Sequence, residues 1–129
     1  MVVYLSPEQV DDLHAAQIEH YGGRPGLRDR GALEAAVARP AMTFGGEDLY
    51  PDIPAKAAAM MHSLVMNHPY VDGNKRVGAH AALLFLTANG YSTDISPKDL
   101  EGVTLTVARG ELDAEALAIW FRQRISREE

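Results

Sequence analysis

Residues 68–90 read HPYVDGNKRVGAHAALLFLTANG, a polar loop followed directly by a strongly apolar segment. Pro69 disfavours helical geometry at the residue before it, so a preceding helix is expected to end near His68. Val77 to Asn89 is apolar on nearly every side, and Gly90 provides a C-terminal stop. A helix that is apolar all round is usually buried at the centre of its domain. We therefore expect this stretch to place a polar loop at one end of a central helix.

Helix-start signals recur along the rest of the chain. Ser6-Pro7-Glu8-Gln9 combines an N-cap serine, a proline at the first helical position and a glutamine three residues after the cap, which predicts a helix running to Tyr21. Three further helices are expected to start after the caps Asp29, Asp52 and Ser96 and to end near residues 39, 67 and 109, respectively. A last helix is expected to start after Asp113 and to carry Leu117, Trp120, Phe121 and Ile125.

The segments between these helices predict the fold class. Residues 41–51 lack periodicity and are expected to form a loop, and residues 91–95 could form a short extended piece without a sheet. The chain has no repeats, low-complexity tracts or linkers. We expect a single all-α domain over residues 1–129, a compact bundle of about six helices around a buried central helix.

Composition narrows the class of protein. Apolar residues make up 47% and charged residues 23% of the 129 residues, an ordinary balance for a soluble globular domain. The net charge of −6 argues against a protein that coats nucleic acid through a basic surface. With no cysteine, disulfides and thiolate metal sites are excluded. No stretch approaches the roughly 20 apolar residues that span a bilayer, and MVVYLSPEQV lacks the features of a secretion signal, so we expect a cytoplasmic protein without membrane contact.

The loop itself carries the residues of an anion site. Backbone N–H groups at the start of the following helix have no partner within that helix, and the helix dipole favours negative charge there. Gly73 permits unusual backbone angles and a close approach, while Asn74, Lys75 and Arg76 add donors and two positive charges. Phosphate is the expected guest.

Two further residues complete a chemical set. Asp72 has the wrong charge to bind phosphate, but one or two carboxylates with waters and phosphate oxygens usually hold Mg²⁺. His68 supplies an imidazole, which accepts protons well near neutral pH. These groups indicate phosphoryl or nucleotidyl transfer. The alternative is a surface turn in which Asp72 and Asn74 compete to cap a helix.

The segment His68 to Arg76 resembles the signature HPFx[DE]GN[GK]R of the Fic/Doc family, with Tyr70 in place of phenylalanine and Lys75 as the Doc-type option. The resemblance covers nearly the whole chain. It also includes the segments YLSPEQ, YGG, GLRD and ALLFL with the NG that follows, at residues 4–9, 21–23, 26–29, 82–86 and 89–90. The fold implied is that of Fic/Doc proteins.

The resemblance also implies roles for the loop residues. His68 is expected to deprotonate a hydroxyl of a target protein, and Asp72 to bind Mg²⁺. The remaining residues of the motif are expected to hold and neutralise the phosphates of ATP: Gly73, Asn74, Lys75 and Arg76.

Two departures from the adenylylating members of the family favour a kinase. Lys75 stands where those members have glycine and crowds the phosphate loop, and Ala79 stands where they have a second arginine. Doc-type members bind ATP in the reverse sense, with the terminal phosphate facing the histidine, and elongation factor Tu is their associated substrate. We therefore expect phosphorylation of a Ser or Thr hydroxyl of a translation protein, which blocks translation, and adenylylation is the alternative.

A third departure keeps a different class of function open. Phage-type Doc has an arginine two residues before the motif histidine, where this chain has Met66. Arg24, Arg28 and Lys56 are candidates to compensate. A non-catalytic binding module that retains the loop as a phosphate or partner site is the rival, and a nuclease is disfavoured because one metal carboxylate is visible and no basic surface is.

The resemblance implies a toxin whose partner is a Phd-like antitoxin. Self-inhibited Fic enzymes carry an inhibitory helix with the pattern (S/T)xxxE(G/N), which this sequence lacks. Inhibition in trans is therefore expected, through an exposed groove that takes an antitoxin helix.

The other polar and large apolar residues receive structural interpretations. His14 and His20 are expected at or near the surface, and His62 and His80 as packed histidines; none lies in a metal-ligand pattern. Core positions are expected for Met60, Met61, Trp120 and Phe121. Glu47, Asp48 and Tyr50 are expected in a surface loop, which could act as a flap over the target or the nucleotide.

Overall fold

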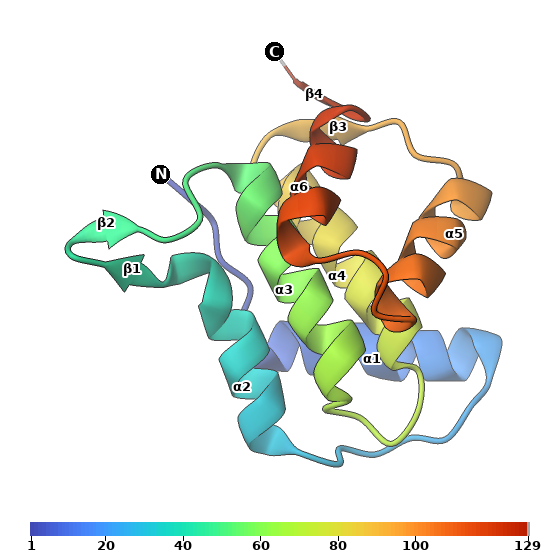
Figure 1. Cartoon of the computed structure of the whole chain (residues 1–129). Coiled ribbons are helices and arrows are strands. Elements are labelled where there is room, and N and C mark those ends of the chain that lie inside the picture. The colour runs from blue at the N-terminus through green and yellow to red at the C-terminus, as the bar shows by residue number, and fades with distance from the viewer. Residues whose placement is uncertain (129) are drawn as a thin grey trace.

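The computed structural model describes residues 1–128 and contains six α-helices, which confirms the all-α prediction (Figure 1). In chain order the elements are α1 Pro7–Tyr21, α2 Arg30–Ala38, the 3₁₀ turn η1 Arg39–Ala41, β1 Thr43–Phe44, β2 Glu47–Asp48, α3 Ile53–Asn67, α4 Asn74–Ala88, β3 Tyr91–Thr93, α5 Pro97–Ala108, α6 Ala114–Arg122 and β4 Ile125–Arg127. Within the described residues, no helix is both long and apolar enough to cross a membrane.

The helices begin where the sequence predicts. Each capping side chain accepts a hydrogen bond from the backbone N–H three residues further on, and Ser6 forms a complete capping box with Gln9. The cap residues of these five helices are Ser6, Asp29, Asp52, Ser96 and Asp113. The cap of α3 has a second role, because both oxygens of Asp52 also accept from Arg122, which ties α3 to α6.

The core is built on α3, which packs against α2, η1, α4, α5 and α6. Eleven of its fifteen residues are buried, compared with eight of fifteen in α4. A Cβ atom on Gly78 of α4 would lie 2.8 Å from Val65 Cγ2, so the absence of a side chain there permits the close crossing of α3 and α4. The most buried helix is therefore α3, with α4 beside it, although the sequence indicates the helix after the loop as the central one.

Two short antiparallel ladders differ from the predictions. Residues 41–51 contain a hairpin, β1 with β2, in place of an irregular loop. β3 confirms an extended piece within residues 91–95, but it pairs with β4, so Thr93 lies opposite Ile125. The expectation that the last helix includes Ile125 is wrong, because α6 ends at Arg122 and the chain turns to pair with β3. No local signal reveals a partner strand more than thirty residues away.

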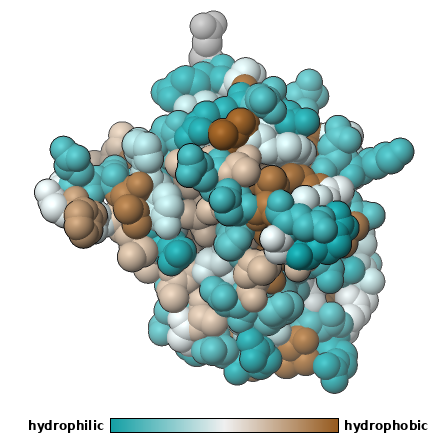
Figure 2. Space-filling view, viewed as in Figure 1, coloured by the Kyte–Doolittle hydropathy of each residue, from teal (hydrophilic) through white to brown (hydrophobic). Residues whose placement is uncertain are grey.

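The hairpin formed by residues 43–48 projects from the domain (Figure 1). Its tip carries Phe44, which is 82% exposed, and apolar atoms are visible on this projection in the space-filling view (Figure 2). The base is fixed by Lys56 of α3, whose ammonium group is buried. Lys56 Nζ donates to the carbonyl oxygens of Pro40 and Tyr50, at 3.1 and 2.7 Å, and to Asp48 Oδ2 at 3.2 Å.

Candidate active site

The α3–α4 loop, residues 68–73, begins and ends with left-handed backbone. His68 is the C-cap of α3, with φ 48° and ψ 61°. Among residues 1–128, it is the only residue other than glycine that has a positive φ. Gly73 is the N-cap of α4 at φ 78°. The sequence prediction that Gly73 supplies an unusual backbone angle is confirmed. The His68 conformation costs free energy that its surroundings must supply, because L-residues disfavour this region.

Asp72 is held by two main-chain donors. Its Oδ2 accepts from the N–H of Arg24 at 3.0 Å, and its Oδ1 from the N–H of Gly73 at 2.9 Å. These bonds, together with the charges of Arg24 and Arg76, hold the pKa of the exposed carboxyl below its ordinary value. Asp72 is therefore ionised at neutral pH, with lone pairs left for a hydrated cation.

Asn74 braces the loop from within. Its side-chain amide accepts from the N–H of Tyr70 at 2.9 Å and donates to the Tyr70 carbonyl at 2.9 Å. The same Nδ2 lies 3.4 Å from Nδ1 of His68, which is long for a hydrogen bond and does not fix the imidazole tautomer. The buried side chain is thus committed to the loop. The first main-chain N–H groups of α4 have no side-chain cap.

Helix α1 supports the loop from below. His14 is 4% exposed, and its ring stacks on Tyr70 with centroids 3.8 Å apart and an interplanar angle of 7°. His14 Nε2 lies 2.7 Å from the carbonyl oxygen of Asp72, where it donates, and the Tyr70 hydroxyl donates to Asp11 at 2.7 Å. Burial and the Asp11 carboxylate raise the pKa of Tyr70, so this hydroxyl remains a donor. The expectation of a surface position for His14 is wrong, because its ring fills the space between α1 and the loop.

The segment between α1 and α2 runs antiparallel to the loop and binds its main chain. The carbonyl of Pro69 accepts from the N–H groups of Arg28 and Asp29 at 2.8 and 2.9 Å, and the N–H of Val71 donates to Gly26 at 3.0 Å. Backbone pairing of this kind leaves the loop little freedom to change shape.

The three basic candidates to compensate for Met66 lie in different places. Arg28 reaches two main-chain carbonyls of the loop region with its guanidinium group. Arg24 contacts the loop through its main chain, and Lys56 is buried near the other end of α3. Met66 itself is half-buried and packs against the core.

Lys75 and Arg76 extend from the first turn of α4. Lys75 is exposed, and within residues 1–128 no salt bridge to it is found. Arg76 lies with its guanidinium carbon 5.1 Å from the centroid of the Tyr21 ring, and it donates to the carbonyl of Gly22 at 3.3 Å. Both cations therefore remain at the mouth of the site.

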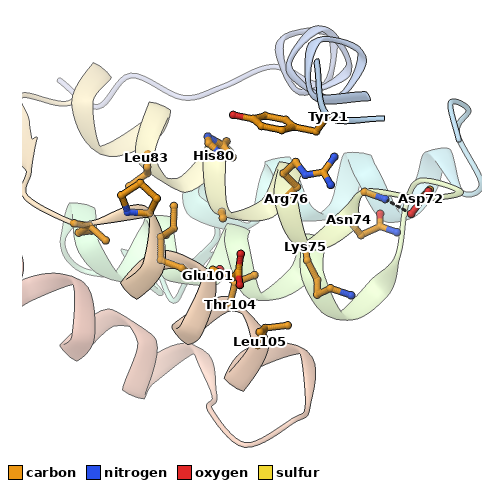
Figure 3. A pocket seen from close by; sticks show the side chains of 15 residues that line it. Tyr21, Asp72, Asn74, Lys75, Arg76, His80, Leu83, Glu101, Thr104 and Leu105 are labelled. Atoms are coloured by element: carbon orange, nitrogen blue, oxygen red, sulfur yellow. Dashed lines mark hydrogen bonds between the residues drawn. The ribbon is translucent and has the colours of Figure 1, made fainter. Parts of the chain in front are cut away.

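A cavity of about 740 Å³ adjoins the N-terminal end of α4. Figure 3 shows Arg76 and His80 of α4 beneath the Tyr21 ring, with side chains of α5 on the facing wall. Burial and the Arg76 charge lower the pKa of His80, so its ring is neutral at pH 7. The lining of the cavity includes Lys75 and Arg76 at the start of α4, and the apolar side chains of Leu83, Ile95, Leu100 and Leu105.

The other histidines and the large apolar side chains differ in their burial. His62 and His80 are partly buried, His20 is exposed, and Phe121, Met60 and Met61 are fully buried, while Trp120 is only partly buried. Burial lowers the pKa of His62, an effect to which the charge of Arg39 adds. Among the described residues, no three His, Asp or Glu side chains converge as a metal site.

The sequence of this chain is similar to those of known proteins. The sequence model of the Fic/DOC family matches residues 4–86, about two thirds of the chain. A protein of Mycolicibacterium smegmatis named Toxin Doc is 42% identical over 120 residues, which cover 92% of this chain and 90% of the relative. A protein of Escherichia phage P1 named Protein kinase doc is 34% identical over 120 residues, covering 93% of this chain and 94% of the relative.

The chain belongs to the Fic/Doc family. The resemblance seen in the sequence is thereby confirmed, together with the fold that it implies. Every residue of the expected Fic/Doc site lies within the matched range: His68, Asp72, Gly73, Asn74, Lys75 and Arg76. The structure brings them together at the junction of α3 and α4, and their individual roles remain predictions.

Sequence reasoning missed the residues that support the Fic/Doc loop from elsewhere in the chain. His14, Tyr70 and Asp11 form a buried group beneath it, and Arg28 lies against its first residue. One signal was present in the sequence: His14 falls on the apolar stripe of α1 that includes Val10. The apolar stripe of an amphipathic helix faces the core, so this position favours burial of His14.

Proposed function

We propose that this Fic/Doc chain is a toxin that transfers the terminal phosphate of ATP to a Ser or Thr hydroxyl of a translation protein. The observation that carries the proposal is the placement of an exposed imidazole, His68, next to the N-terminus of α4, where an ionised carboxylate and two cations also lie. Phosphoryl transfer needs mainly positioning and electrostatic stabilisation, so this small set of groups is chemically sufficient.

The proposed step is a direct displacement at phosphorus. As the hydroxyl oxygen of the target bonds to the terminal phosphorus, its proton passes to a ring nitrogen of His68. The bond from phosphorus to the bridging oxygen breaks and ADP leaves. The main-chain N–H groups at the start of α4 hold the transferred phosphoryl oxygens, and Lys75 and Arg76 neutralise the negative charge that develops.

Asp72 fits a magnesium ion as a cofactor. Mg²⁺ usually keeps several waters and takes one or two protein carboxylates together with substrate phosphates, so a single ionised and exposed Asp72 is an adequate ligand. A magnesium ion held by Asp72 would neutralise negative charge on the phosphates of ATP.

Adenylylation is the second candidate, and two side chains speak for the kinase. Lys75 lies at the mouth of the phosphate site. One turn further along α4, this chain has Ala79 where adenylylating members have a second arginine. A relative of this chain is named a protein kinase. The two activities differ in which phosphorus the target hydroxyl attacks.

The test is the intact mass of elongation factor Tu after incubation with this protein, Mg²⁺ and ATP. A gain of one phosphate that disappears with His68→Ala is the expected result, and general-base loss of about 10²- to 10⁴-fold is sufficient to remove it. A gain of AMP identifies the adenylyltransferase. An unchanged mass contradicts elongation factor Tu as the substrate, and incubation with a cytoplasmic lysate and ATP labelled on the terminal phosphate then separates another target from a binding module.

We further propose that a Phd-like antitoxin neutralises the protein in the cytoplasm. Support comes from the relative named Toxin Doc and from the partly apolar cavity between α4 and α5, next to the phosphate site. A helix docked there shields Arg76 and Tyr21 at the entrance. The proposal fails if the expressed chain neither arrests growth nor binds the protein encoded beside it.

A further inference from the structure

Arg28 makes a bidentate contact with the end of α3. Its Nε donates to the carbonyl oxygen of His68 at 2.7 Å, and its Nη2 donates to that of Asn67 at 2.9 Å. Both are charge-assisted bonds of short length. The last carbonyls of a helix have no partner within it and carry the negative end of its dipole, so a guanidinium group is well matched to this position.

Arg28 also holds the next peptide group through its main chain. Its own N–H and that of Asp29 both donate to the carbonyl of Pro69. Arg28 therefore fixes two successive peptide planes, the one after His68 through its side chain and the one after Pro69 through its main chain, where Asp29 adds a second donor. The plane after His68 sets ψ of this residue, and the ring of Pro69 restricts the φ that follows.

This clamp lies where the backbone needs it. His68 is in the left-handed region, and it has no glycine-like freedom to stay there. His68 is exposed, and among the described residues the hydrogen-bond contact of its ring is with Asn74 Nδ2, at 3.4 Å. The direction of the imidazole therefore depends on the main chain that carries it.

We infer that Arg28 is a positioning residue for His68: it fixes the left-handed backbone at the end of α3 and thereby aims the imidazole. The guanidinium group acts through main-chain carbonyls and contacts no reacting atom. The effect on catalysis rests on the proposed transfer activity, whereas the effect on His68 itself does not.

The first experiment uses the full chain with ¹³C-labelled histidine. Spectra resolve the Cε1 resonances of the five histidines, and His68 is assigned with His68→Ala. Arg28→Ala is expected to shift or broaden the His68 signal towards that of a freely rotating imidazole and to leave those of His20, His62 and His80 in place. Arg109→Ala is the matched control, because Arg109 is also exposed and bonded at a helix end, but it lies at the end of α5.

The second experiment measures kinetics of phosphate transfer. Arg28→Ala is expected to lower kcat about 10- to 100-fold, because a small misplacement of the reacting group is costly, with the KM for ATP unchanged. Arg28→Lys keeps the charge but reaches one carbonyl, so it restores part of kcat and serves if the alanine variant does not fold.

The outcomes separate the hypotheses. An unchanged His68 signal in Arg28→Ala overturns the positioning role whether or not the wild type transfers phosphate. A raised KM for ATP with unchanged kcat also overturns it, since that pattern means that Arg28 binds the nucleotide. A wild type without transfer activity, but with a His68 signal that responds to Arg28→Ala, contradicts the proposed function and supports the clamp.

Discussion

The α3–α4 loop and the β1–β2 hairpin are both short connections at the ends of buried helices, yet they are attached to the protein in opposite ways. The loop is bound by α1 and by the segment between α1 and α2 through many separate hydrogen bonds. In residues 1–128, the hairpin formed by residues 43–48 has one hydrogen bond to the rest of the domain, from Lys56 to Asp48. Lys56 also binds Tyr50 and Pro40 on either side of the hairpin.

The difference in attachment suits the loop to hold reacting groups in place and the hairpin to contact another protein. A site for phosphoryl transfer needs its groups within fractions of an ångström, and a set of modest bonds supplies this because no single bond must supply it alone. A projecting hairpin with exposed Phe44 at its tip suits contact with a protein of variable shape. One buried cation, Lys56, holds the base of this hairpin.

Lys56→Met is expected to have the largest effect. It removes three hydrogen bonds from a side chain that is 2% exposed, and it leaves two carbonyl groups without their donor. We expect the free energy of unfolding to fall by about 2–4 kcal/mol, as measured in urea, and the amides of residues 43–48 to exchange faster with solvent. The exposed Lys98→Met serves as control. If hairpin exchange is unaltered, the single-tether description is wrong.

A pair of glycine substitutions compares the two regions directly. Gly73 and Gly46 have similar positive φ, 78° and 82°, but a Cβ on Gly73 lies 3.3 Å from Ile18 Cδ1 and 3.4 Å from His14 Nε2, while one on Gly46 meets nothing within 4 Å. Gly73→Ala should cost about 2 kcal/mol of unfolding free energy, from backbone strain and crowding, and Gly46→Ala about 1 kcal/mol from strain alone. Equal losses in thermal unfolding would mean that the loop is no more tightly packed than the hairpin.

His14→Leu removes the contacts of the His14 ring with the α3–α4 loop. The carbonyl of Asp72 loses the donor at 2.7 Å and Tyr70 loses its stacked imidazole, so we expect a loss of about 1 kcal/mol. The rate of phosphate transfer should also fall, because the carbonyl belongs to Asp72, the residue proposed to bind Mg²⁺. His20→Leu, at an exposed position of the same helix, is the control. A variant that keeps full activity shows that the other loop bonds are sufficient without His14.

The smallest effect is expected from protonation of Asp72. Its carboxylate is stabilised in the folded state by the N–H groups of Arg24 and Gly73, so its pKa lies below the ordinary 3.8. The stabilisation is present above pH 3.8 and is lost as the pH falls through the lower folded-state value. In ¹⁵N spectra the amide signals of Arg24 and Gly73 should move together with a midpoint below pH 3.8. Asp72→Asn should abolish this movement; independent midpoints for the two amides contradict the shared carboxylate.

The sequence predicts the helices well because their signals are local. A cap such as Ser6 or Asp113 is bonded three residues away, within the window that a pattern can cover. The α3–α4 loop is also found from the sequence, since its proline, glycine and charged residues are contiguous. A local pattern cannot reveal the pairing partner of Ile125. That partner is Thr93 of β3, and because of this pairing the end of the predicted helix is a strand.

The support of the site is invisible for the same reason. His14 and Asp72 are 58 residues apart, Arg28 and His68 are 40 apart, and neither pair belongs to one periodic pattern. Lys56 is a partial exception, because a single lysine within the apolar run AKAAAMM indicates a cation that must be paired if the helix is buried. The sequence identifies the reactive groups, and the tertiary structure identifies what aims them.

The packing of α6 on α3 affects when the protein becomes active during its synthesis. His68 lies at the end of α3, yet α3 is covered by Leu117 and Phe121 of α6, which are translated after every residue of the site. A nascent chain that lacks α6 has an open side on its most buried helix, and domains fold as units. The helix that ends at His68 is therefore not fully packed until α6 has left the ribosome. For a toxin proposed to act on a translation protein, this order means that the packing behind the site is completed by α6, which is translated after every residue of the site.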